Sequence, residues 1–60
     1  MNTLKWVNMA APLFDYSGVK LVTVPQGTVV EAYGWEESFV GVLREAVIYQ
    51  TETHKYNGFI

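Results

Sequence analysis

Cysteine is absent from this chain of 60 residues, so no disulfide can brace it and no thiolate can bind zinc. Histidine is scarce as well, because His54 is the only imidazole, and a transition-metal site needs several such ligands. No apolar run approaches the roughly 20 residues of a membrane-spanning helix, and the first residues lack the apolar core of a signal peptide. These absences predict a cytoplasmic protein with no bound metal and no membrane partner.

Positive charge is also in short supply. Four Lys or Arg residues stand against six Asp or Glu residues, which gives a net charge of −2. Nucleic-acid binding without sequence preference depends on clustered cations, so this balance predicts no nucleic-acid partner. The five glycines are scattered, and none of their spacings forms a phosphate-binding loop, so we expect no cofactor.

The residues that carry catalysis are few and are not arranged in a motif. Nucleophilic catalysis needs a nucleophile, a base and a group that orients the base. Asp15 is the only aspartate and His54, in a polar context, is the only base of its kind, and their spacing matches no known triad. Glu36 and Glu37 are adjacent, so in a strand they point to opposite faces rather than forming an acid–base pair. The sequence therefore predicts a protein that is not an enzyme.

Half of the chain is hydrophobic, and turn residues divide it into short pieces, as in a small all-β domain spanning residues 1–60. Residues 4–9 are expected to form a first strand that stops at Ala11-Pro12, because the residue before a proline favours extended geometry over helix. A loop is expected over residues 13–18. Phe14 and Tyr16 are large for a loop, and we expect them to close one end of the core, with a binding role as the alternative.

Two β-rich segments, residues 19–24 and 28–33, flank the tetrapeptide Val24-Pro25-Gln26-Gly27. Proline at the second position and glycine at the fourth position of this tetrapeptide favour a type I turn. Two strands joined so tightly are expected to pair antiparallel as a hairpin.

Residues 35–50 are compatible with two structures. Apolar residues recur at helical spacing, but the β-branched residues and Gly41 favour two strands, near 38–43 and 45–52. The chain then ends in Asn57-Gly58-Phe59-Ile60, and Asn-Gly is a strong hairpin signal.

The order of these pieces resembles that of the bacterial SH3-like domain, a small barrel of five to six strands. The resemblance rests on four short motifs, which are Val7-Asn8-Met9-Ala10-Ala11-Pro12, Gln26-Gly27-Thr28-Val29-Val30, Gly34-Trp35, and Asn57-Gly58-Phe59-Ile60. The chain departs from the family at Ala10, where an arginine is usual, and the family's terminal strand after Ile60 is missing. The resemblance implies an antiparallel SH3-like barrel of five or so short strands. It also implies a targeting module, since family members mostly bind wall peptides outside the cell.

Aromatic residues are the one surplus, at 15% of the chain. A barrel this small has room inside for only some of them, and Phe39 and Phe59 are the best core candidates because neither has a polar atom. Tyrosine and tryptophan are enriched at binding hot spots. The alternative is that the rings fill the core or an interface between copies. The candidate partner-binding residues are Trp6, Tyr16, Tyr33, Trp35, Tyr56 and, as a cation, Arg44.

These observations lead to two main hypotheses. The first is a non-catalytic module that binds a protein or peptide partner through its aromatic surface. The second is a homo-oligomer that binds an anionic small molecule, similar to the sponge and inhibitor proteins that phages use against bacterial defence. Its anion-contacting candidates are Arg44, Lys20, Lys55 and Lys5. A barrel that stacks single-stranded nucleic acid on Trp and Tyr ranks third, because the charge balance opposes it.

Overall fold

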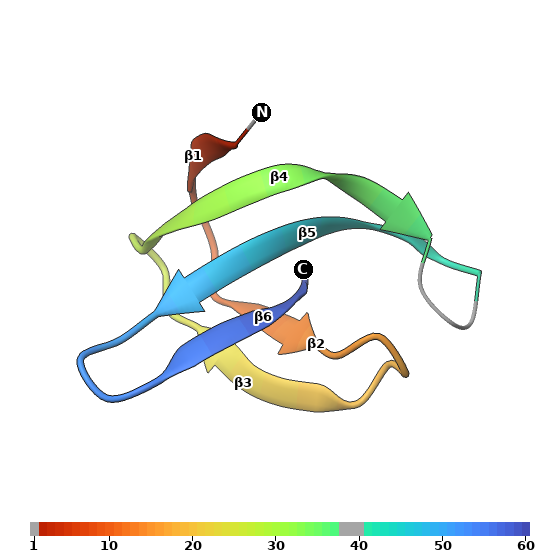
Figure 1. The fold of residues 1–60 in the computed structure, drawn as a ribbon. Helices are drawn as coiled ribbons and strands as arrows, with labels where there is room; N and C mark the ends of the chain where they lie inside the picture. The colour runs from red at the N-terminus through yellow and green to blue at the C-terminus, as the bar shows by residue number, and fades with distance from the viewer. Residues whose placement is uncertain (1, 38–40) are drawn as a thin grey trace.

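The computed structural model describes residues 2–37 and 41–60, which form six strands in a single antiparallel sheet (Figure 1). The all-β prediction is confirmed. No helix is present in the described residues, and so none that is long and apolar enough to cross a membrane. The strands, in chain order, are β1 (Thr3–Trp6), β2 (Ala11–Phe14), β3 (Lys20–Val24), β4 (Val29–Glu37), β5 (Leu43–Gln50) and β6 (Lys55–Phe59).

The spatial order of the sheet is β1-β4-β5-β6-β2-β3, which leaves β1 and β3 as its two edges. The predicted hairpin between residues 19–24 and 28–33 is therefore wrong: β3 pairs with β2, and β4 pairs with β1 and β5. Val24 and Val30 are both buried in the same hydrophobic cluster. The two segments thus pack side chain against side chain in the core, and this burial replaces the expected ladder of hydrogen bonds.

The connection between β3 and β4 is a turn, but it differs from the predicted one. It spans residues 25–28, because the Thr28 N–H donates to the Pro25 carbonyl at 3.3 Å. Gly27 then occupies the third position with a φ of 84°, which is the signature of a type II turn rather than type I. Val7 is hydrogen-bonded to this turn. Its N–H donates to the Thr28 carbonyl, and its carbonyl accepts from the Gly27 N–H.

Strand β2 includes Leu13 and Phe14, which were expected in a loop, and it contains Pro12. A proline has no N–H, so it fits a strand only where no neighbour needs that donor. Pro12 lies opposite Thr23 of β3, whereas β6 pairs with β2 only at Phe14. Pro12 therefore lies in the part of β2 that is not paired with β6, where no residue of β6 needs its N–H. Leu13, placed in a loop by the sequence, is a fully buried core residue.

Strand β4 continues past its predicted end at residue 33 to Glu37, and β5 spans Leu43–Gln50, where a strand was expected near 45–52. Residues 38–40 of the first predicted strand lie outside the described residues, and β5 is a single strand that includes Arg44. The register between β4 and β5 shifts between Ala32 and Trp35. Two residues of β4, Tyr33 and Gly34, therefore face one residue of β5, which is a β-bulge.

Strand β6 contains Asn57-Gly58 in its interior, so the hairpin expected from this dipeptide is not formed. Val47 of β5 lies opposite Gly58. A Cβ at Gly58 would lie 2.5 Å from the Phe14 carbonyl oxygen and 3.2 Å from the Leu13 Cγ. The glycine therefore allows β2 to approach β6 closely.

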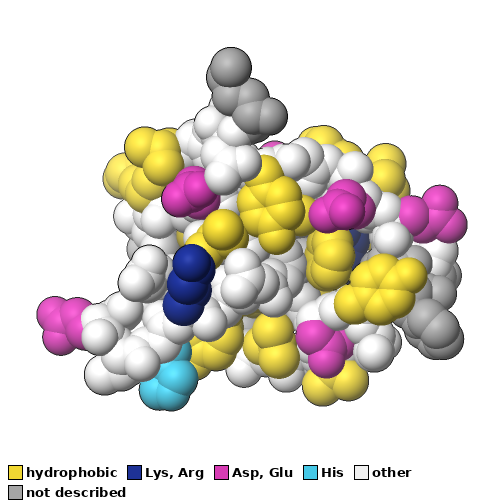
Figure 2. Space-filling view, in the orientation of Figure 1, with side chains coloured by type: hydrophobic (Ala, Val, Ile, Leu, Met, Phe, Trp, Pro, Cys, Tyr) yellow, Lys and Arg dark blue, Asp and Glu magenta, His cyan; other side chains and the backbone are white. Residues whose placement is uncertain are grey.

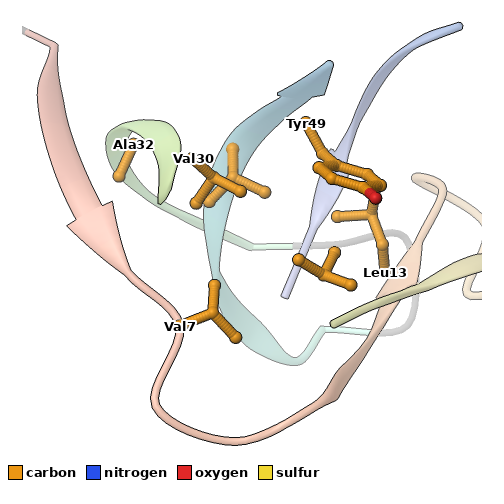
Figure 3. Packing of buried hydrophobic residues seen from close by; sticks show 7 residues of the cluster. Val7, Leu13, Val30, Ala32 and Tyr49 are labelled. Carbon is orange, nitrogen blue, oxygen red and sulfur yellow. The ribbon is translucent and has the colours of Figure 1, made fainter. Parts of the chain in front are cut away.

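The core lies on one side of the sheet and is mainly aliphatic (Figure 3). Its buried cluster consists of Val7, Leu13, Val24, Val30, Ala32, Val47 and Tyr49. Phe59 is only half-buried and is not part of this cluster, contrary to the prediction, while Phe39 lies outside the described residues. Tyr49 is the one aromatic member of this cluster among the described residues, and the other members are aliphatic.

Candidate functional site

The register of the sheet assigns each aromatic residue to one of two faces. Residues directly opposite each other on neighbouring strands project from the same face, and the faces alternate along each strand. Ala32 and Val47 are opposite each other and buried, so they define the inner face. Glu31 and Ile48 are also opposite each other and project from the outer face. The candidate residues separate between these two faces.

The outer face of β1 and β4 carries a cluster of exposed apolar side chains, which we call the outer patch: Leu4, Trp6, Val29 and Tyr33. Their exposed fractions are 77%, 60%, 51% and 38%, respectively. Trp6 lies directly opposite Val29, and Leu4 lies opposite Glu31, between Val29 and Tyr33 along β4. Cross-strand neighbours at this spacing contact one another. The outer patch is therefore continuous across two strands.

Acidic side chains accompany the outer patch. Glu31 projects from the same face between Val29 and Tyr33, and it accepts a hydrogen bond of 2.7 Å from the Asn2 side-chain amide. Glu36, beyond the bulge, shares this face with Arg44, which lies opposite it on β5. In Figure 2, hydrophobic and acidic side chains lie interspersed on the visible face, together with Lys or Arg side chains. The site thus combines aromatic and aliphatic surface with negative charge.

Trp35 does not belong to the outer patch, because the bulge turns it to the inner face. It lies opposite Glu45 at the rim of the core, where the Lys5 ammonium forms an ion pair with the Glu45 carboxylate. The same ammonium lies 6.0 Å from the Trp35 ring centroid, at the limit of a cation–π contact. Lys5 is therefore engaged by two neighbours, and Trp35 and Trp6 lie on opposite sides of the sheet.

Tyr16 and Arg44 belong to a third group of residues, near the meeting of β2 and β6. The Tyr16 and Phe59 ring centroids are 6.4 Å apart. The Arg44 guanidinium carbon lies 4.6 Å from the centroid of Phe14, which is opposite Phe59. Phe14 and Tyr16 were expected to close one end of the core, but neither is among the side chains packed against the buried cluster, and Tyr16 is 57% exposed. The Arg44 cation lies against the Phe14 ring.

Tyr56 lies apart from these groups, beside the turn between β5 and β6. Its ring stacks on Tyr49 at 5.8 Å and on His54 at 5.9 Å. His54 is exposed, as expected, and its Nδ1 lies 2.9 Å from the Thr53 hydroxyl. Tyr56 is half-buried in this stack, so it offers less free surface than the outer patch.

Other kinds of site were also sought. In residues 2–37 and 41–60, no group of three His, Asp or Glu side chains is placed to hold a metal ion. No pocket is found in this part of the structure either. The four cations Lys5, Lys20, Arg44 and Lys55 lie on four different strands, β1, β3, β5 and β6. The best-formed feature of the described surface is therefore the outer patch with its acidic neighbours.

Comparison with known proteins gave no relative, as no family model, curated protein or solved structure matches this chain. The site therefore rests on its own geometry. Sequence reasoning selected Trp6 and Tyr33 but missed Leu4, Val29 and Glu31. The alternation of Val29, Glu31 and Tyr33 with the buried Val30 and Ala32 is the signal that places them on one outer face.

Proposed function

We propose that this chain is a non-catalytic interaction module, SH3-like in class, that binds a protein or peptide through the outer patch. The observation that carries the proposal is the continuous exposure of Leu4, Trp6, Val29 and Tyr33 across two paired strands. Large contiguous apolar surface is uncommon on a monomeric protein and marks interaction sites. Trp and Tyr are also the residues that contribute most at binding hot spots.

The second hypothesis, an anion-binding oligomer, receives less support. An anion site gathers several cations, whereas the four here are distributed over four strands. Two of them already have partners, since Lys5 is paired with Glu45 and Arg44 lies over Phe14. The interaction module is therefore the function that the arrangement supports best.

The proposal is tested by selecting peptides from a random display library on the folded chain and measuring the affinity of a selected peptide. Trp6→Ser removes the largest side chain of the outer patch and is expected to weaken binding about tenfold or more, the scale of a hot-spot residue. Met9→Ser is the matched control, because Met9 is 77% exposed but lies outside the six strands. Equal loss in both variants, or loss in neither, contradicts the proposal.

A further inference from the structure

The acidic residues beside the outer patch identify the kind of partner that it fits. We infer that the outer patch docks a basic segment of a partner protein, in which Lys or Arg alternates with apolar side chains. This inference rests on the proposed function and adds the chemistry of the partner. Three observations support it: the carboxylates on this face, the exposed rings beside them, and the repulsion expected between two copies of the patch.

On β1 and β4 the charged side chains of the outer face are the carboxylates Glu31 and Glu36, whereas the cations that the register places on this face, Arg44 and Lys55, lie on β5 and β6. Lys5–Glu45 is the one ion pair within the described part of the chain, and it lies on the inner face. Within residues 2–37 and 41–60, the side-chain partner of the Glu31 carboxylate is a neutral amide, that of Asn2. The guanidinium nearest to Glu36 in the register, that of Arg44, lies over the Phe14 ring. A partner cation therefore finds two carboxylates on this face, on either side of Tyr33.

The exposed rings favour the same partner. A Lys or Arg side chain is attracted to the face of Trp or Tyr, and its aliphatic stem covers apolar surface. Trp6 and Tyr33 offer such rings within the same patch as Glu31. An extended segment with alternating side chains would thus place apolar groups on Leu4 and Val29 and cations near the carboxylates.

A second copy of this chain is a poor occupant by the same argument. Pairing two outer patches about a two-fold axis would bring the carboxylates of Glu31 and Glu36 toward those of the other copy. Like charges at an interface oppose association, and each chain already carries a net charge of −2. The charges therefore select a basic partner over self-association.

The test uses Trp35→Phe as the background, because Trp6 is then the only tryptophan and its emission reports on the outer patch. Three short peptides are titrated, in which valine alternates with arginine, glutamine or glutamate. We expect the arginine peptide to bind most tightly and to lose affinity as salt is raised. Replacing both acids, Glu31→Gln with Glu36→Gln, is expected to weaken its binding about three- to tenfold, the scale of two exposed charge pairs.

Glu52→Gln is the control, because Glu52 is exposed in the turn between β5 and β6, away from β1 and β4. It changes the net charge without changing the patch and should leave the affinity within about twofold. Cooperative urea unfolding of every variant verifies that each one is folded.

Each other outcome overturns the inference. Equal binding of the glutamine and arginine peptides, with sensitivity to Trp6→Ser, shows that the patch docks segments without regard to charge, and the proposed function then survives. If no peptide changes the Trp6 emission, the basic partner is rejected, and the display selection decides the proposed function separately. A doubled mass of the free wild-type chain in light scattering at micromolar concentration identifies a second copy as the occupant.

Discussion

At the scale of single residues, the fold depends on a few positions where size is restricted. Gly58 is the clearest, because β2 lies so close to β6 that a methyl group at Gly58 would overlap the Phe14 carbonyl oxygen. Leu13, which is also close to Gly58, is fully buried in the core. A domain of this size has little stability to spare, so changes at either position have large effects.

Gly58→Ala is expected to destabilise the protein by about 1–3 kcal/mol, the usual cost of forcing extra volume into a packed site. The backbone atom at 2.5 Å cannot rotate away, so β2 itself must move. Urea unfolding measures the change. Asn57→Ala, at the exposed neighbouring position in β6, is the control and should change stability by less than about 0.5 kcal/mol. Similar changes in the free energy of unfolding for the two variants would show that β2 does not lie close to β6 at Gly58.

Leu13→Ala truncates the largest fully buried side chain among the described residues and is expected to cost about 2–5 kcal/mol, enough to unfold a marginal domain. Leu43→Ala makes the same chemical change where the side chain is 62% exposed. It should cost less than about 0.5 kcal/mol. Thermal or urea unfolding of both variants checks the pair. A Leu43 effect as large as that of Leu13 would contradict the assignment of the core.

At the scale of elements, β4 determines where the site lies. It is the longest strand, it pairs with β1 and β5, and it presents the buried Val30 on one face and the exposed Tyr33 on the other. The bulge at Tyr33 and Gly34 then changes the alternation, so that Trp35 projects from the inner face. Strand β4 thus contributes residues to the core, to the outer patch and to the rim of the core at Trp35.

The sequence predicted that residues 19–24 and 28–33 are extended, but the prediction that they pair with each other is wrong. Strand propensity and turn residues are local properties, whereas the choice of partner depends on which valines share the core. Val24 and Val30 satisfy this requirement by packing in one cluster, which no local pattern reveals. The site was also only partly predictable. The sequence shows that Trp6 and Tyr33 are ring side chains suited to binding, but only the pairing of β1 with β4 shows that they share one face.

The strand pairing predicts which protons lie close together in solution. Nuclear Overhauser contacts between the backbones of β1 and β4 are expected around Lys5 and Val30, and between β2 and β3 around Leu13 and Val22. No backbone ladder is expected between β3 and β4. A regular series of cross-strand contacts from Val24–Val29 outward would contradict the sheet order and restore the hairpin.

At the scale of the whole molecule, an acidic domain exposes an apolar patch, and the described residues leave the side chains of this patch open to solvent. The net charge of −2 and the carboxylates beside the patch give the chain a means of staying apart from its own copies. Two edge strands, β1 and β3, offer further places for association. Charge is therefore expected to control whether the patch meets a copy or a partner.

This balance predicts that neutralising the patch promotes self-association. The wild-type chain should run as a monomer in light scattering at micromolar concentration, and the double change Glu31→Gln with Glu36→Gln should raise the average mass. Glu52→Gln removes one charge elsewhere and should leave the mass unchanged. An identical mass for all three proteins at every concentration would show that these carboxylates do not limit self-association.

The most direct measurement of the central claim is a map of backbone amide shifts as the arginine–valine peptide is added to the wild-type chain. The largest shifts are expected on β1 and β4, at Leu4, Trp6, Val29, Glu31 and Tyr33, while the Tyr49–Tyr56 stack stays unchanged. Shifts centred on Tyr56, on Tyr16 or on Trp35, with the outer patch unmoved, would contradict the central claim.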